Sequence, residues 1–333
     1  CEEESKLMAA VIRFGPELKK EMGEVSELRR NIPITCPGHS RAVPDLCFSN
    51  KTPRGVFLLS SCLDGKPMIR DGKSGDWIGT FEGHKGAIWC ARFNSSGSHV
   101  ATASADFTAK LFDSCNGDEI STFEHDHVVK CVEFSSDGLN LFTSGHESKL
   151  RCFDIERSDA EPISTADTDG KPSDIVVCKN NPNIIITSSN EKSGINVWDR
   201  RTFQVEKSLE SKENVNSLQI KDDQTVLIST AGRVVQFWNT DTLELNKMVV
   251  IPPTDNSVDR LNCASFHPNR TMFIASFQDE LWVHCYDYET EKQIACQRGH
   301  HGPIFSVAFA PDGLCYASGS EDSTIRLWET HSK

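Results

Sequence analysis

Several features that would point to other classes of protein are missing from this chain of 333 residues. No apolar run approaches the roughly 18 residues of a membrane-spanning helix. The sequence contains no GxSxG motif of serine hydrolases, no HExxH motif of zinc proteases and no zinc-finger spacing. Basic residues do not cluster with aromatic ones and the net charge is −13, which disfavours direct nucleic-acid binding. We therefore predict no catalytic, cofactor, metal or small-molecule substrate site and no association with a membrane.

The 13 cysteines form no CxxC pair, and most of them fall within apolar, strand-like patterns. We interpret them as reduced, buried thiols, which favours a cytoplasmic and nuclear protein. Secreted disulfides and a zinc site are the alternatives.

The first 30 residues differ from the rest of the chain. Leu18, Met22, Val25 and Leu28 are spaced by four, three and three positions, which is typical of one face of a helix. We predict an N-terminal extension over residues 1–30 that is helical or disordered. Two interpretations remain open: the segment binds a partner, or it docks nowhere.

From residue 31 onward a unit of about 43 residues recurs. In its last copy, Gly299 and His300 precede two short apolar runs, Asp322 lies in the next turn, and Trp328 ends the unit. A few short strands cannot bury both faces of a sheet alone, so the copies must stack on one another. Seven copies align, with spacings of 41 to 46 residues, at His39, His84, His125, Thr168, Ser211, Ser257 and His300. The sequence therefore predicts an all-β, seven-bladed propeller over residues 31–330.

The two ends of the repeat region predict how the ring closes. The chain ends too soon after Trp328 for a fourth strand in the last blade. Residues 31–36 precede the first repeat, where the fourth strand of a preceding blade would lie. We expect Ile32 and Ile34 to complete the last blade and so remove an open sheet edge.

The Gly-His pair at one end of the unit, and the aspartate six residues before a final tryptophan or phenylalanine, resemble the WD40 family. In that family the histidine, a strand serine or threonine, the turn aspartate and the tryptophan form a hydrogen-bonded line across each blade. The resemblance implies this structural role for His84, Thr102, Asp106, His300, Ser318, Asp322 and Trp328. The units that begin at Thr168, Ser211 and Ser257 lack the full set, so we expect a less rigid arc there.

Longer stretches resemble the serine/threonine kinase receptor-associated protein (unrip) family, for example Gly75–Trp89, Ser104–Asp113 and the sequence from Gly302 to Trp328. The resemblance implies a non-enzymatic adaptor. It implies association with the SMN complex in spliceosomal snRNP assembly, and hence mRNA splicing, through small Gemin subunits, and a link to TGF-β receptor and Smad signalling. Other WD40 roles remain open, such as a ubiquitin-ligase substrate receptor or a G-protein-β-like signalling subunit.

The WD40 resemblance also indicates where a partner would bind. In that family the fifth residue after the histidine, and the residue before the turn aspartate, often reach the narrower face around the central channel. The first set here is Pro44, Trp89, Lys130, Ser173, Asn216, Asn262 and Phe305. Because aromatic residues anchor protein interfaces, we take Trp89 and Phe305, with Lys130 and Glu321, as candidate partner contacts. Packing of both aromatic residues between blades is the alternative, and an exposed edge around Trp77 and Trp282 is a second candidate.

Overall fold

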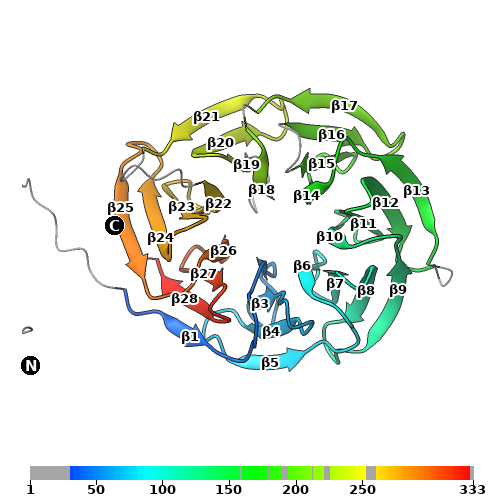
Figure 1. The fold of residues 1–333 in the computed structure, drawn as a ribbon, viewed down its shortest axis with the longest axis horizontal. Helices are drawn as coiled ribbons and strands as arrows, with labels where there is room; N and C mark the ends of the chain where they lie inside the picture. Colours follow the sequence, from blue (N-terminus) through cyan, green and yellow to red (C-terminus); the bar gives the residue numbers. More distant parts are fainter. Residues whose placement is uncertain are drawn as a thin grey trace, which may run out of the picture. The chain divides into compact units, whose positions relative to one another are not determined.

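The computed structural model describes residues 31–330, apart from 158–159, 179, 190–193, 212, 221–225 and 253–259. The predicted extension over residues 1–30 lies outside the described residues. Within them, 28 strands form seven four-stranded sheets arranged as the blades of a ring (Figure 1). The chain is therefore an all-β, seven-bladed β-propeller. Among the residues that the structure describes, there is no helical segment with the length and apolar character needed to span a bilayer.

Blades 1 to 6 are each built from four strands that follow one another along the chain, and the first of them lies innermost. Blades 1 to 3 consist of β2 (Leu46–Phe48), β3 (Phe57–Ser60), β4 (Met68–Asp71) and β5 (Trp77–Thr80); β6 (Ile88–Phe93), β7 (His99–Ser104), β8 (Thr108–Asp113) and β9 (Glu119–Glu124); and β10 (Val129–Phe134), β11 (Asn140–Gly145), β12 (Lys149–Asp154) and β13 (Pro162–Asp167).

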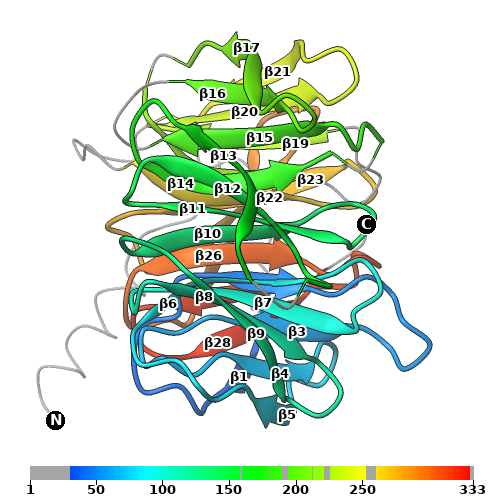
Figure 2. The same ribbon diagram turned by 90° about the vertical axis from the view of Figure 1, so that its right-hand side faces the viewer.

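Blades 4 to 6 follow the same order; blades 4 and 5 lie across the ring from blades 7 and 1, and blade 6 lies beside blade 7 (Figures 1 and 2). They consist of β14 (Pro172–Val177), β15 (Ile184–Ser189), β16 (Ile195–Asp199) and β17 (Gln204–Leu209); β18 (Val215–Ile220), β19 (Val226–Ala231), β20 (Val234–Asn239) and β21 (Leu245–Val250); and β22 (Leu261–Phe266), β23 (Met272–Phe277), β24 (Trp282–Asp287) and β25 (Gln293–Arg298).

Blade 7 joins the two ends of the repeat region. Its inner strands are β26 (Ile304–Phe309), β27 (Cys315–Ser320) and β28 (Ile325–Glu329), and its outer strand is β1 (Ile34–Cys36). β1 is antiparallel to β28, with Ile34 opposite Leu327 and Cys36 opposite Ile325. The prediction for Ile32 is wrong: it lies outside the strand and is 88% exposed. Pro33 has no N–H to donate, so the ladder begins after it.

The hydrophobic core is divided among the junctions between neighbouring blades. In the described part of the chain, seven clusters of buried apolar residues each combine side chains from two adjacent blades. The cluster between blades 7 and 1 includes Cys36 of β1, Val43 and Ile325. Because every blade buries both faces against neighbours, the ring supplies what a single sheet of four short strands lacks.

Twelve cysteines lie in the described chain, none of them in a disulfide. Eight are buried, Cys115 is exposed, and the other three are half-buried. Burial raises the pKa of the Cys263 and Cys285 thiols to about 12, so these side chains behave as small apolar core residues.

Candidate protein-binding site

A chain of hydrogen bonds crosses blade 7 and joins Trp328, Ser318, His300 and Asp322. The indole Nε1–H of Trp328 donates to the Ser318 hydroxyl (2.8 Å), which lies 2.7 Å from Nε2 of His300. Nδ1 of His300 lies 3.0 Å from an Asp322 carboxylate oxygen. The Asp322 carboxylate can only accept, so the neutral His300 donates to it from Nδ1, and Nε2 then accepts from the Ser318 hydroxyl.

The Asp322 carboxylate is held by several donors in the turn between β27 and β28. It accepts hydrogen bonds from the backbone N–H of His301 (2.8 Å) and from both the N–H and the hydroxyl of Thr324. Burial opposes ionisation, but these hydrogen bonds and the adjacent His300 outweigh it and lower the pKa of Asp322 to about 2. The network therefore fixes the turn and the strand register, which is a structural task.

Blade 2 holds the same arrangement with one donor fewer. His84 lies 2.8 Å from Asp106 through Nδ1 and 2.6 Å from Thr102 through Nε2. Phe112 stands where blade 7 has Trp328, and its buried ring has no donor. Despite its burial, hydrogen bonds from His84 and Thr108 hold the pKa of Asp106 well below its usual range.

The other blades keep parts of the pattern. In blade 1, Arg70 occupies the aromatic position and donates to the carbonyl oxygens of Gly75 and Pro37. Blades 4 and 5 retain the tryptophan part, in which Trp198 donates to Thr187 and Trp238 donates to Ser229, both at 2.9 Å. The predicted lower rigidity of blades 4–6 stays a prediction.

One cluster in blade 1 has the donor atoms of a metal site. Ligand atoms of His39, Cys62 and Asp64 lie within 4.8 Å of one another. His39 and Asp64 occupy the positions of His84 and Asp106 in blade 2, and His39 Nε2 lies 2.7 Å from the hydroxyl of Ser60, the counterpart of Thr102. The cluster offers three ligands, whereas a closed structural zinc site uses four. We assign it to the hydrogen-bonded network of its blade.

The predicted partner residues at the channel mouth share one local geometry. In six blades the pairing of the innermost strand with the next strand shifts by one residue close to its start. A β-bulge of this kind leaves one residue unpaired and re-aims its side chain. The skipped residues are Trp89, Lys130, Ser173, Asn216, Asn262 and Phe305.

The bulged side chains surround a cavity of about 120 Å³ at this end of the channel. Trp89 and Phe305 are half-buried and line it together with Pro44. Lys130 also lines it, with its Nζ atom 3.1 Å from the centre of the Trp89 ring. Glu321 is not among the lining residues; it is exposed in the turn after β27, where its N–H donates to the carbonyl of Pro303 (2.9 Å). The structure therefore brings three of the four candidates together.

Deeper in the channel lies a charged cluster that the sequence analysis missed. Arg92 of β6 pairs with Asp45, with Glu133 (3.5 Å) and with Asp174 (3.9 Å). Burial raises the pKa of Asp174 to about 6 even though Arg92 opposes the rise. The available signal was the occurrence of charged residues within apolar inner strands.

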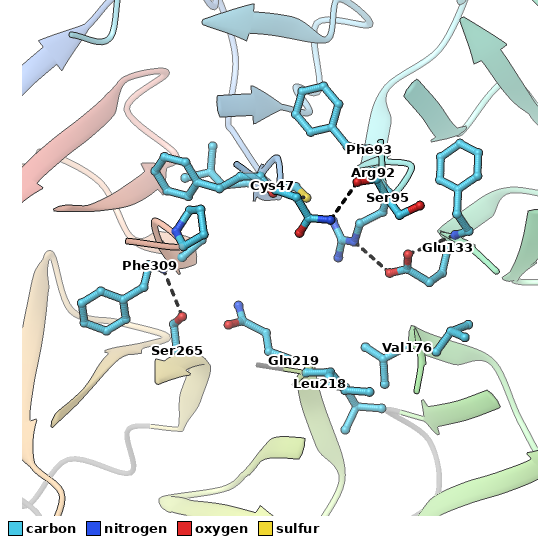
Figure 3. Close-up of a pocket in the computed structure, with 18 of the residues that line it drawn as sticks. Cys47, Arg92, Phe93, Ser95, Glu133, Val176, Leu218, Gln219, Ser265 and Phe309 are labelled. Atoms are coloured by element: carbon cyan, nitrogen blue, oxygen red, sulfur yellow. Dashed lines mark hydrogen bonds and ion pairs between the residues drawn. The ribbon is translucent and has the colours of Figure 1, made fainter. Parts of the chain in front are cut away.

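Figure 3 shows Arg92 and Glu133 pointing toward each other, with Leu218 and Gln219 of β18 on the other side of the channel. These residues line a second cavity of about 200 Å³, and all but Glu133 also line the mouth cavity. The charged cluster thus separates the mouth from the other end of the channel.

Trp77 and Trp282, the second candidate, do not make a comparable surface. Trp77 of β5 is 60% exposed and donates to Thr80 (3.1 Å). Trp282 of β24 is half-buried beneath the Arg298 guanidinium, 4.1 Å from its ring centre. They belong to blades 1 and 6, with blade 7 between them.

Comparison with known proteins agrees with this architecture. The family model described as "WD domain, G-beta repeat" matches residues 75–113, 117–154 and 291–329. The serine-threonine kinase receptor-associated protein of Dictyostelium discoideum is 42% identical over 297 residues, which cover 89% of this chain and 98% of that protein. The chain belongs to the serine-threonine kinase receptor-associated protein family.

The Homo sapiens member of this receptor-associated protein family is also 42% identical, over 301 residues that cover 90% of this chain and 83% of that protein. A more distant relative is eukaryotic translation initiation factor 3 subunit I of Drosophila willistoni, 27% identical over 312 residues (87% of this chain, 95% of that protein). The serine-threonine kinase receptor-associated proteins are a WD40 family that is generally non-enzymatic.

Proposed function

We propose that this chain is a non-enzymatic scaffold of the cytoplasm and nucleus that gathers other proteins at its channel mouth. Its proposed partners are the small Gemin subunits of the SMN complex, which acts in spliceosomal snRNP assembly, and TGF-β receptor and Smad proteins. The observation that carries the proposal is the family membership, with 42% identity across about nine-tenths of the chain. The relatives' name, receptor-associated protein, supports a role in assembly with other proteins.

The side chains at the mouth support its use as the binding face. The repeat's polar residues in blades 2 and 7 are engaged in hydrogen bonds that hold those blades together, as in the line from Trp328 to Asp322. At the mouth, by contrast, Trp89 and Phe305 lie half-buried beside a cavity. A few residues carry most of the binding energy of a protein interface, and tryptophan is enriched among them. We therefore assign partner binding to Trp89, Phe305 and Lys130, with Glu321 on the adjoining exposed turn.

The test is affinity purification of the tagged full chain, with its partners quantified by mass spectrometry. We expect Gemin and Sm proteins with the unaltered chain, and at least a tenfold loss with Trp89→Ala or Phe305→Ala. Trp77→Ala is the matched control, because it removes an indole that is more exposed and lies outside the mouth. A version that starts at Asn31 measures what residues 1–30 add.

Each alternative result has a defined meaning. Loss of partners with Trp77→Ala and not with Trp89→Ala would move the binding face to the outer strands. Recovery of cullin-linked subunits, or of translation initiation factors, in place of Gemin proteins would contradict the proposed pathway. Melting temperatures measured for each variant separate loss of binding from loss of folding.

A further inference from the structure

The mouth of the channel is chemically divided around the ring. The seven mouth positions carry apolar side chains in blades 7, 1 and 2, a cation in blade 3, and neutral polar side chains in blades 4, 5 and 6. In that order they are Phe305, Pro44, Trp89, Lys130, Ser173, Asn216 and Asn262. The apolar arc and the cation are thus adjacent.

The neutral polar arc is already occupied by the fold itself. Ser173 donates to the carbonyl of Val215 (3.2 Å), Asn216 to that of Leu261 (2.6 Å) and Asn262 to that of Ile304 (2.9 Å). Each of these carbonyls belongs to the innermost strand of the next blade. These three side chains therefore tie blade to blade, which uses the Ser173 hydroxyl and one N–H of each asparagine amide.

Lys130 and Trp89 are in the opposite situation. The Lys130 ammonium lies over the Trp89 ring, and no hydrogen bond or ion pair joins it to the residues that the structure describes. The Trp89 Nε1–H is buried and has no acceptor within the same part of the chain. Burial lowers the pKa of Lys130 to about 8, which leaves it charged at neutral pH. A half-buried cation whose only partner is an aromatic face lacks an anion.

The nearest carboxylates do not supply that anion. Asp45, Glu133 and Asp174 converge on Arg92 deeper in the channel, which leaves three carboxylates around one guanidinium. Such an excess of negative charge repels an extended polyanion from the channel. A single carboxylate held at the rim of the mouth is still compatible with this excess of negative charge.

We propose that the channel mouth binds an acidic peptide segment of a partner protein, with a carboxylate on Lys130 Nζ and an adjoining apolar side chain on the Phe305–Pro44–Trp89 arc. This inference rests on the proposed function and adds the chemistry of the ligand. The carboxylate supplies a charge-assisted hydrogen bond in a partly water-excluded site, and the arc supplies the apolar contact.

The test selects ligands for the full chain from a library of random 12-residue peptides displayed on phage. The enriched peptides are synthesised, and their Kd values are measured by fluorescence polarisation. We expect enriched sequences to place an aspartate or glutamate beside an aromatic or branched apolar residue. Lys130→Gln is expected to weaken binding at least tenfold, Lys130→Arg to stay within about threefold, and Trp89→Ala to weaken it as well. Replacing the acidic residue of the peptide by its amide should match the effect of Lys130→Gln.

Two results would overturn the inference. One is an enriched set of peptides whose binding depends on Trp89 but is unchanged by Lys130→Gln. In that case the mouth is still a binding face, but the proposed acidic ligand is refuted. The other is an enriched set unaffected by Trp89→Ala and Phe305→Ala, which places ligands elsewhere. Failure of the proposed function is distinguishable, because it appears as unchanged partner recovery from cells with Trp89→Ala.

Discussion

Replacement of Asp322 by asparagine is the sharpest test of the view that the polar residues of the repeat serve folding. One carboxylate oxygen lies 3.0 Å from His300 Nδ1 and 2.8 Å from the N–H of His301, and the other accepts from Thr324. Asparagine offers only one acceptor oxygen. Its NH2 group would take the place of the other carboxylate oxygen and face N–H or O–H donors there. The variant keeps the volume of the side chain and removes its charge.

The size of the effect follows from the pKa of Asp322. A decrease from 3.8 to about 2 corresponds to about 2.4 kcal/mol at 1.36 kcal/mol per unit. Because solvent screens part of this interaction, we expect Asp322→Asn to lower the free energy of unfolding by about 1 to 2 kcal/mol at pH 7. Urea denaturation followed by circular dichroism measures it. Asp312→Asn in the exposed turn of the same blade is the control and should change stability by less than about 0.5 kcal/mol.

The pH dependence gives the prediction its sign. A carboxyl group whose pKa is lower in the folded state stabilises the fold above its unfolded pKa, and this contribution is lost as pH falls toward the folded pKa. The gap between Asp322→Asn and the unaltered chain should therefore be constant from pH 7 to pH 5 and about half as large at pH 3. An equal difference in unfolding free energy at pH 3.5 and pH 7 would mean that the charge of the Asp322 carboxylate does not stabilise the fold. A gap below about 0.5 kcal/mol at pH 7 would show that the blade does not depend on the network.

Three further predictions concern the rest of the ring. The stability of Asp174→Asn, relative to the unaltered chain, should rise by about 2 kcal/mol as the pH increases from 4.5 to 7.5. The reason is that a buried carboxyl with a pKa of about 6 costs stability once it ionises. A difference in urea titrations that does not change with pH would contradict this. Arg70→Ala should cost about 2 kcal/mol, because two carbonyl oxygens lose their donor, and an unchanged urea midpoint would assign the guanidinium no structural role. Iodoacetamide at pH 8 should alkylate Cys115 before any other described cysteine and Cys90 only after unfolding, as mapped by peptide mass spectrometry; similar rates at both sites would refute the burial of Cys90.

The fold could be predicted from the sequence because a propeller repeats one local pattern. Each copy of the pattern forms the same contacts within its blade. A copy that lacks some of the typical residues, such as the one that begins at Thr168, can therefore be identified by its spacing from more complete copies. The closing strand was predictable in position but not in extent. Its first paired residue depends on Pro33, whose missing N–H shortens the ladder to the three residues from Ile34 to Cys36.

The site was harder to predict, because its geometry depends on features that the repeat does not encode. The spacing from the histidine located Trp89 and Lys130, but not the bulge that turns each side chain into the mouth. The contact between them joins neighbouring blades and depends on how the two sheets pack. The cluster around Arg92 unites blades 1 to 4, so no single repeat contains its pattern.

The bulges explain how one ring can keep its fold while its recognition surface varies. A bulged residue is skipped by the strand pairing, so its side chain is not needed for the sheet register. The structure uses this freedom in two ways: Ser173, Asn216 and Asn262 bind the backbone of the next blade, whereas Trp89 and Lys130 contact each other beside the cavity. Substitutions in the two groups should therefore affect different properties. Asn262→Ala should lower the urea midpoint with little effect on ligand affinity, and Lys130→Gln should lower ligand affinity with little effect on the urea midpoint. If both variants changed stability alone, the mouth would be a structural element throughout.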